Sequence, residues 1–316
     1  QSNEKVFPII ARYAHKEDEH PDGWDFTLCG GHHGANGYGI LTRPSPYILP
    51  EGNVQISFSG GRTSAYMLHE IMVANDGLPE RAVVTFANTG REMPETLDFV
   101  HDCSVQWDVP IVWLEYDRPD GKAGYSVVNE NSASRDGEPF EILINQKKYL
   151  PNIAARFCTT ELKILPMKRY LTKELGWKKW TACVGIRADE HHRAKMDSKD
   201  RWAYWYPLLD AGVSKLDVNK FWAESWFDLK LDNAAGSTPK GNCDFCFLKS
   251  EAILASMAKQ HPERAEWWMR MERERGSTFR KGRDMNEFVD FVQRQHDWIF
   301  DEEGFFCQTD DGECTG

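Results

Sequence analysis

The sequence lacks the long apolar runs and the excess of positive charge that mark two large classes of protein. No stretch approaches the roughly 18 apolar residues that span a bilayer, and the first residues do not follow the charged-then-apolar pattern of a signal peptide. The net charge of −11 argues against broad, non-specific nucleic-acid binding, although a local basic groove stays open. Repeats and low-complexity tracts are also missing. These absences favour a soluble, cytoplasmic enzyme that does not engage membranes, and they leave its oligomeric state open.

The composition is that of an ordinary globular protein. With 316 residues, 41% of them hydrophobic and 28% charged, the chain is long enough for one large domain or two modest ones. We expect an irregular N-terminal extension over residues 1–50, an α/β domain over 51–232, and a helical C-terminal region with a Cys-x-x-Cys loop over 233–316. In the extension, the run from Cys29 to Gly34 favours a glycine-rich loop over a metal site.

Apolar strands alternate with helical patterns from residue 54 onward. Strands are predicted at 54–58, 82–87, 110–114 and 180–186, and helices at about 64–75, 93–107, 162–175 and 218–226. The polar segment 118–150 is predicted to be an inserted loop or hairpin, and a further helix is expected to begin near Pro151. This alternation predicts an α/β fold, a doubly wound parallel sheet with helices on both faces. Such sheets bind ligands at the carboxyl ends of their strands.

A glycine turn follows the first predicted strand, in the order Ser59-Gly60-Gly61-Arg62-Thr63-Ser64. Glycines allow backbone N–H groups to approach an anion, and the N-terminus of the following helix adds partial positive charge. The serines add hydroxyl donors, and Arg62 can pair with phosphate. The spacing of a Walker P-loop is absent. The turn therefore predicts an anion site of another kind.

Four motifs in order resemble the phosphoadenosine phosphosulfate (PAPS) reductase family, a branch of the adenine nucleotide alpha-hydrolase-like (HUP) superfamily. The Ser59–Ser64 turn resembles its PP-loop, with Arg62-Thr63 where Lys-Asp is commoner. Asn88-Thr89-Gly90 followed by Pro94-Glu95-Thr96 is similar to a second motif. The third and fourth are Cys158-Thr159-Thr160-Glu161-Leu162-Lys163-Ile164-Leu165-Pro166 and Gly185-Ile186-Arg187-Ala188-Asp189-Glu190-His191-His192-Arg193. The resemblance covers about residues 54–250.

The resemblance implies a role for each matching residue. The phosphates of ATP or a related adenylyl nucleotide would lie on Ser59, Gly60, Gly61, Arg62, Thr63 and Ser64, and its ribose or adenine beside Asn88, Thr89 and Gly90. Arg62, Lys163 and Arg187 would act as cationic catalytic residues. Mg²⁺ would help to neutralise the pyrophosphate, and the available carboxylates are Glu92, Glu95, Asp189 and Glu190.

The cysteines set this chain apart from the resembled pattern. Cluster-bearing members hold [4Fe–4S] with a Cys-Cys pair and a later Cys-x-x-Cys, and Cys243 follows Cys158 by 85 positions (243 minus 158). Thr159 replaces the second cysteine of the pair, so the matching thiols are Cys158, Cys243 and Cys246. The cluster would then have three protein ligands and one open iron. Alternatively, Cys183, Cys307, Cys314 or a histidine is a fourth ligand and the metal is zinc, or the thiols are bare.

Three functions follow from these observations. The leading one is cleavage of ATP or an adenylyl nucleotide at the α-phosphate, with sulfur transfer through the cluster. The second is reduction of a sulfonucleotide by Cys314, since Glu313-Cys314 echoes the Glu-Cys of reductase tails. The third is a non-catalytic nucleotide-binding subunit of a multi-protein system. A sulfur donor or redox protein is an expected partner. The acceptor stays open among a specific nucleic acid (a tRNA base or a DNA backbone), a small metabolite and a partner protein. A nucleic-acid acceptor would use the basic residues Lys147, Lys148, Lys163, Lys168, Arg169, Lys178 and Lys179.

Overall fold

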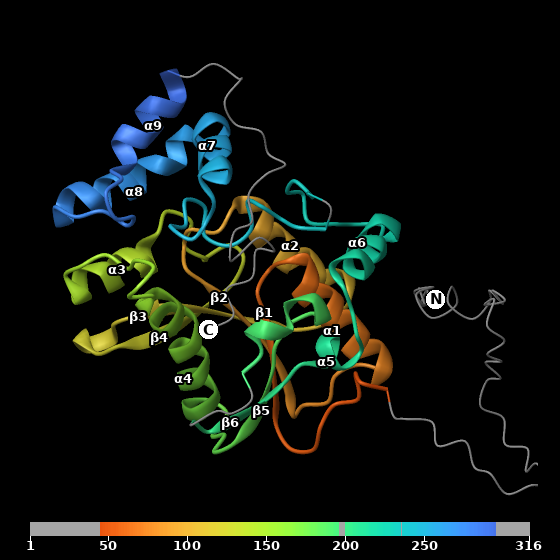
Figure 1. Ribbon diagram of the computed structural model, residues 1–316. Coiled ribbons are helices and arrows are strands. Elements are labelled where there is room, and N and C mark those ends of the chain that lie inside the picture. The colour runs from red at the N-terminus through yellow and green to blue at the C-terminus, as the bar shows by residue number, and fades with distance from the viewer. Residues whose placement is uncertain (1–44, 196–199, 235, 295–316) are drawn as a thin grey trace, which may run out of the picture. The chain divides into compact units, whose positions relative to one another are not determined.

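The computed structural model describes residues 45–195, 200–234 and 236–294 (Figure 1). Their centre is a sheet of six strands in the order β4-β3-β2-β1-β5-β6. All neighbouring strands are parallel except β3 and β4. The strands are β1 Val54–Phe58, β2 Ala82–Asn88, β3 Ile111–Asp117, β4 Gly124–Val128, β5 Trp180–Cys183 and β6 Trp202–Trp205. The predicted α/β class with a doubly wound sheet is confirmed, with one antiparallel edge strand.

The two faces of β1 differ in chemistry. Val54, Ile56 and Phe58 are buried on one face, as expected of a central parallel strand covered on both sides. Gln55 and Ser57 alternate with them and point to the other face, where Gln55 donates hydrogen bonds to Ser57 and to Thr85 of β2. A polar strip therefore runs along the middle of the sheet.

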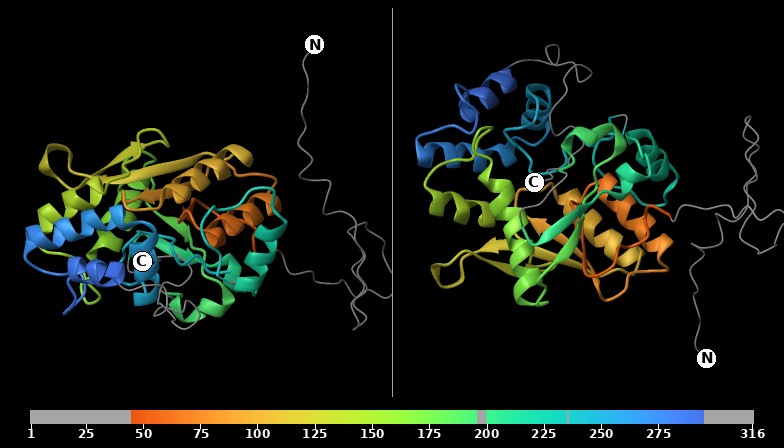
Figure 2. Two further views of the ribbon diagram at one scale, coloured as in Figure 1. Left: turned by 90° about the horizontal axis from the view of Figure 1, so that it is seen from above. Right: turned by 60° about the horizontal axis from the view of Figure 1, so that its bottom comes forward.

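Helices cover both faces of this sheet. On one face, α1 contacts α6, and Phe99 of α2 meets Trp222 of α6 edge to face at 5.1 Å between ring centroids. On the other face, α3 and α4 pack against β3, so that Figure 2 shows them separated from α1 and α2 by the strands. The helices are α1 Arg62–Ala74, α2 Pro94–Gln106, α3 Glu138–Lys147, α4 Leu165–Lys173, α5 Pro207–Asp210, α6 Lys215–Glu224, α7 Glu251–Gln260, α8 Pro262–Arg275 and α9 Met285–Arg294, with the 3₁₀ helices η1 Pro119–Gly121 and η3 Ala188–Arg193 and the π-helix η2 Thr159–Ile164.

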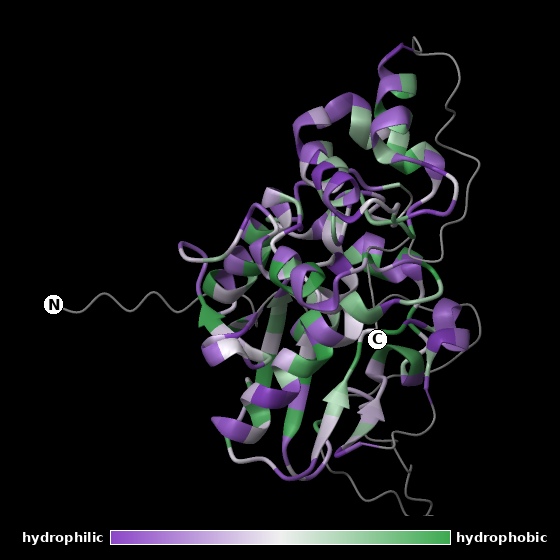
Figure 3. Ribbon diagram, turned by 90° about the vertical axis from the view of Figure 1, so that its left-hand side faces the viewer, coloured by the Kyte–Doolittle hydropathy of each residue, from purple (hydrophilic) through white to green (hydrophobic). Residues whose placement is uncertain are grey.

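The helices α7, α8 and α9 pack on one another and form the predicted helical C-terminal region. Trp268, Met271 and Phe288 are buried among them, as expected for apolar faces at helical spacing. Figure 3 shows hydrophobic residues gathered in the strands, whereas the helices alternate hydrophobic and hydrophilic residues along their length. Among the helices of the described residues, none has the length and apolar character needed to traverse a bilayer.

Two local predictions differ from the structure. The helix expected near Pro151 is wrong, because the side chain of Asn152 accepts hydrogen bonds from the N–H groups of Ala154 and Ala155 and closes a turn instead. The segment 118–150 forms the predicted hairpin through β4, but it also contains α3. The predicted domain boundaries stay a prediction. The run from Cys29 to Gly34 lies outside the described residues.

Pro166 shapes the helical segment before β5. Proline has no N–H to donate, so the regular hydrogen-bond ladder cannot continue through it. The preceding turn is the π-helix η2, a form that is rare and often found at functional sites. Thr159, Lys163 and Met167 follow one another at intervals of four residues across this junction and come to one side of it.

Candidate functional site

The glycine turn between β1 and α1 is held tightly against α2. Gly60 has φ +81°, and a Cβ atom there would lie 2.7 Å from the Cγ2 of Thr96. A side chain at this position would therefore meet both backbone strain and a clash. The turn needs glycine at Gly60 because α2 packs directly on it.

The two serines of the turn are joined by hydrogen bonds. The hydroxyls of Ser59 and Ser64 lie 2.9 Å apart, and the backbone N–H of Ser59 donates to Ser64 Oγ at 3.1 Å. Ser64 Oγ also donates to the carbonyl of Gly61. Both serines line a cavity. The predicted anion-binding residues are thus gathered at the N-terminus of α1, where N–H groups and the helix dipole favour negative charge.

This cavity has a volume of about 110 Å³ and runs along the sheet, from Ser59 and Gly185 at the carboxyl ends of β1 and β5 to Trp180 and Trp202, the first residues of β5 and β6. The strand order turns there, because β2 lies on one side of β1 and β5 on the other. Such topological switch points are where open α/β sheets bind ligands. The π-helix η2 and α4 form the wall of the cavity opposite the sheet, with the residues Thr159, Lys163, Ile164, Met167 and Lys168.

The end of the cavity at the first residues of β5 and β6 is aromatic, which we did not predict from the sequence. Trp180 of β5 and Trp202 of β6 stack with ring centroids 5.4 Å apart, and Tyr204 lies beside them along the wall. Trp180 Nε1 is buried and has no hydrogen-bond partner among the described residues. A ligand acceptor in the cavity would satisfy this donor.

The guanidinium of Arg62 is not directed at the cavity. It is 3% exposed and donates to Asp228, to Thr238 Oγ1 and to the carbonyls of Leu229 and Leu231. The predicted phosphate partner therefore ties the start of α1 to residues 228–238. No local sequence pattern indicates Asp228, which lies 166 positions away.

Arg187 is also fully buried and connects two of the predicted motifs. It donates to both carboxylate oxygens of Asp189, at 3.1 and 3.0 Å, and to Thr63 Oγ1 at 3.1 Å. Burial raises the pKa of Asp189, but the hydrogen bonds from Arg187 outweigh it and hold that pKa below its usual value. Glu190 lies 3.4 Å from the same guanidinium and also pairs with Arg193. Arg187 and Thr63 thus support the turn from within the protein.

Asn88 and Gly90 shape the loop after β2. Asn88 is fully buried, donates to Glu115 and to the carbonyl of Ser134, and accepts from the N–H of Gly90. Burial raises the pKa of Glu115. The Asn88 side chain is therefore engaged by the protein, and its role in the described structure is to hold the loop.

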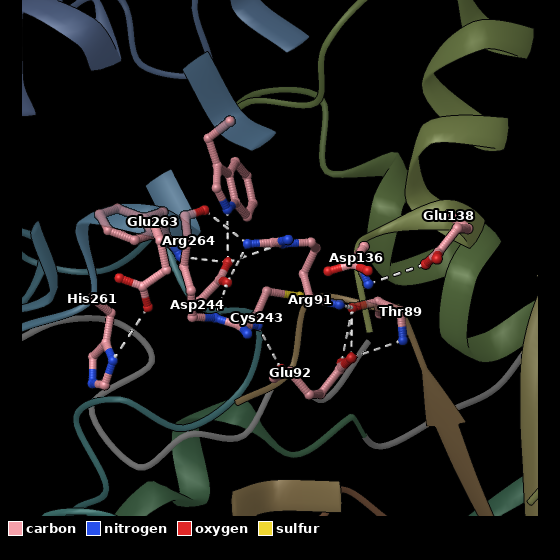
Figure 4. Close-up of polar contacts among 12 residues, drawn as sticks. Thr89, Arg91, Glu92, Asp136, Glu138, Cys243, Asp244, His261, Glu263 and Arg264 are labelled. Atoms are coloured by element: carbon pink, nitrogen blue, oxygen red, sulfur yellow. Dashed lines mark hydrogen bonds and ion pairs between the residues drawn. The ribbon is translucent and has the colours of Figure 1, made fainter. Parts of the chain in front are cut away.

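Thr89 brings the Cys-x-x-Cys loop to the nucleotide motifs. Its hydroxyl lies 3.3 Å from Cys243 Sγ and 2.9 Å from both carboxylate oxygens of Glu92 (Figure 4). Burial, followed by the charge of Glu92, raises the pKa of the Cys243 thiol well above its usual value, whereas Lys163 acts in the opposite direction. Lys163 therefore lies within electrostatic reach of Cys243 while it lines the cavity.

Asp244, inside the Cys-x-x-Cys motif, anchors this loop. Its carboxylate is fully buried and accepts hydrogen bonds from Arg91, from Arg264 at 2.7 Å and from Trp268 Nε1 at 2.6 Å. Figure 4 shows Asp244 between Arg91 and Arg264. Its N–H also donates to the carbonyl of Arg91 at 2.7 Å. The motif residues between the cysteines thus hold Cys243 against the loop after β2, a role that the sequence did not indicate.

The thiols do not form a recognisable metal centre in the described structure. Within residues 45–195, 200–234 and 236–294, no group of three or more His, Cys, Asp or Glu side chains is arranged to hold a metal ion. Cys183 is buried in the core, with its thiol 3.5 Å from the sulfur of Met67. Cys158 and Cys243 are half-buried there, and Cys246 is buried. They do not fit a cluster or zinc site in this part of the chain, and Cys307 and Cys314 lie outside it.

The four carboxylates available to a magnesium ion differ in their partners. Glu92 accepts from Thr89, and Asp189 and Glu190 pair with arginines. Glu95 lies one residue before Thr96, which packs on the glycine turn, and its Oε2 is buried without a hydrogen-bond partner in the described residues. Mg²⁺ is commonly bound by one or two carboxylates together with substrate phosphates. Glu95 fits that role.

The predicted basic patch is partly neutralised. Lys147 donates to Glu161 at 2.7 Å, and Lys168 lies 2.6 Å from a carboxylate oxygen of Asp200. These ion pairs lower the local positive charge on which a nucleic-acid acceptor would depend.

The chain is similar to known proteins in sequence and in structure. A family model described as phosphoadenosine phosphosulfate reductase domain matches residues 53–210. The chain is 33% identical over 211 residues to the uncharacterized nin region protein ORF290 of Escherichia phage lambda, covering 65% of this chain and 69% of that protein. It is also similar to the crystal structure of phosphoadenylyl-sulfate (PAPS) reductase from Candida auris in a phosphate complex, with 17% identity, a TM-score of 0.37, and coverage of 57% of this chain and 79% of that one.

Proposed function

The chain belongs to the phosphoadenosine phosphosulfate reductase domain family, and from that premise we propose that it binds ATP or a related adenylyl nucleotide and cleaves it at the α-phosphate. The observation that carries the proposal is the cavity at the switch point between β1 and β5, with the Ser59–Ser64 turn at its edge and Lys163 in its wall. A volume of about 110 Å³ is smaller than the roughly 300–1,000 Å³ of complete ligand pockets. It suits one part of a nucleotide, with the phosphates extending over the turn.

The proposed chemistry assigns a task to each part of the site. The apolar wall with Trp180 receives the adenine, and the buried Nε1 donates to one of its ring nitrogens. The hydroxyls of Ser59 and Ser64 and the N-terminus of α1 hold the departing pyrophosphate. Lys163 neutralises the charge that develops at the α-phosphate. An acceptor nucleophile attacks the α-phosphorus, the bond to the bridging oxygen breaks, and pyrophosphate leaves.

Mg²⁺ would be held by Glu95 together with the phosphates and would supply charge neutralisation at the pyrophosphate. The unpartnered Oε2 of Glu95 supports this assignment. Glu95→Gln should raise the magnesium concentration needed for half-maximal activity, whereas Asp98→Gln, at an exposed position of the same helix, should not. Equal magnesium dependence in the two variants would argue against Glu95.

Sulfur transfer is the finer part of the proposal and rests on Cys243. Its thiol lies 3.3 Å from Thr89 Oγ1, and the charge of Lys163 acts on its pKa. A thiol group is therefore close to the motifs that are proposed to bind the nucleotide. The proposed reaction does not use an iron–sulfur cluster or zinc, because the described thiols do not fit such a site. The predicted cluster is tested separately, by iron and sulfide analysis of protein purified without oxygen.

The second candidate is sulfonucleotide reduction, which the description of the matched family favours. Two product assays separate the candidates. Pyrophosphate released from ATP supports the first, and sulfite released from 3′-phosphoadenosine 5′-phosphosulfate with a thiol reductant supports the second. Nucleotide binding without either product would support a non-catalytic subunit instead.

Lys163→Met provides the residue-level test, with Lys173→Met at an exposed position of α4 as its matched control. Loss of one charge-assisted contact to the transition state should lower turnover by about 100-fold, and the control should keep wild-type turnover. Equal activity of the two variants would contradict the proposed role of Lys163.

A further inference from the structure

A second cavity lies in the helical C-terminal region, at the turn between α8 and α9. It has a volume of about 320 Å³, and its lining includes Gly282 and three cationic side chains of the turn, Arg280, Lys281 and Arg283. Glu251 at the start of α7 is the carboxylate in its wall and pairs with Arg283 at 3.0 Å. The lining therefore carries an excess of two positive charges.

This turn is fixed from both ends by one buried carboxylate. Glu272 of α8, 4% exposed, accepts a hydrogen bond from the N–H of Phe279 at 2.9 Å and another from the N–H of Met285 at 2.7 Å. Inside the turn, the carbonyl of Arg280 accepts from the N–H of Arg283 at 3.2 Å. The cationic residues are thus presented by a preorganised turn, a property that lowers the entropic cost of binding.

One donor of this turn has no acceptor. Arg280 Nη1 is buried and finds no hydrogen-bond partner in the described part of the chain. An unsatisfied buried donor of a guanidinium is costly, and a ligand oxygen would relieve it by a charge-assisted hydrogen bond. The positive charge of the lining and this unpartnered donor both favour an anionic ligand.

The remaining wall is apolar. Phe247 and Phe279 are stacked, with ring planes 12° apart, and Ile153 at the rim is 71% exposed. A ligand that carried an apolar or aromatic group beside its anion would cover Ile153. The volume falls at the lower end of the range for small-molecule sites.

We propose that this cavity binds a small phosphomonoester dianion that carries an apolar or aromatic group. The phosphate lies against Arg280, Lys281 and Arg283, and the apolar group lies against Ile153. The site is separate from the residues that line the cavity at β1 and β5. Its existence does not depend on the nucleotide proposal.

Calorimetric titration with phenyl phosphate tests the proposal on the full chain. We expect the double variant Lys281→Gln/Arg283→Gln to bind phenyl phosphate at least about tenfold more weakly, since two charge-assisted contacts are lost. Lys220→Gln, at an exposed position of α6, is the control and should bind as wild type. Circular dichroism verifies that each variant is folded. Equal binding by the double variant, or no binding by the wild type, would overturn the site.

Two further arms identify the binding location and the ligand class. The double variant Ser59→Ala/Ser64→Ala should bind phenyl phosphate with the affinity of the wild type. If that variant lost the binding, the anion would lie at the glycine turn instead. Ile153→Ala should weaken phenyl phosphate binding but leave inorganic phosphate binding unchanged. If phenol bound as well as phenyl phosphate, the anion would play no part and the proposal would be wrong.

Discussion

Replacing Asp244 by Asn tests whether the Cys-x-x-Cys loop is held by a buried ionic network. The carboxylate is 0% exposed and accepts from Arg91, Arg264, Trp268 Nε1 and the N–H of Phe245. Asparagine has nearly the same shape, but its Nδ2 is a donor and would face the guanidinium donors of Arg91 or Arg264. Removing one partner of a buried ion pair typically costs about 3–5 kcal/mol.

The matched control is Glu266→Gln on the same helix as Arg264. Its pair with Arg273 has side chains 63% and 56% exposed, and exposed pairs contribute about 0–1 kcal/mol. Urea unfolding should therefore separate the two variants by at least about 2 kcal/mol. Asp244→Asn should also increase the rate at which a thiol reagent modifies Cys243, because the loop that holds Cys243 against Thr89 is loosened. A free energy of unfolding within 1 kcal/mol of wild type, with unchanged modification of Cys243, would refute the reasoning.

Two other predictions concern the glycine turn and the buried thiols. Gly60 and Gly52 both have φ +81°, but a Cβ atom would clash with Thr96 only at Gly60. Gly52→Ala should therefore lower the free energy of unfolding by about 1 kcal/mol through backbone strain, and Gly60→Ala by about 1–3 kcal/mol more. Equal losses in urea unfolding would contradict the close packing of α2 on the turn. Burial raises the pKa of Cys103, Cys183 and Cys243, so the native state keeps protons that the unfolded chain releases above about pH 9. Stability should be at its full value below that pH and fall as the pH rises, by up to about 1.4 kcal/mol per pH unit for each thiol. Cys183→Ala should show a shallower fall, and an identical slope would count against a protonated core thiol.

The sequence predicted the sheet and the glycine turn because both depend on local patterns. The strand at 54–58 and the following glycine turn coincide with β1 and the start of α1, since apolar periodicity and glycine chemistry act within a few residues. Gln55 and Ser57 were a usable sign of the polar strip, because a central parallel strand is normally apolar.

The environment of each charged side chain could not be predicted in the same way. Arg62 pairs with Asp228, and Arg91 with Asp244, across more than 150 positions, so only the folded chain shows that these arginines are occupied by protein partners. The aromatic wall could not be predicted for a similar reason: Trp180 and Trp202 lie on different strands, and only the pairing of β5 with β6 brings them together at the cavity.

Photolabelling with ATP that carries an azide on its adenine ring tests the central claim most directly. After irradiation and proteolysis, mass spectrometry identifies the modified peptides, and excess unlabelled ATP gives the specific fraction. Adenine in the cavity at β1 and β5 predicts specific labelling within residues 159–168, 180–186 or 202–205, which line that cavity or adjoin its walls. Specific labelling confined to residues 247–283, or labelling that ATP does not displace, would contradict a nucleotide site at the switch point.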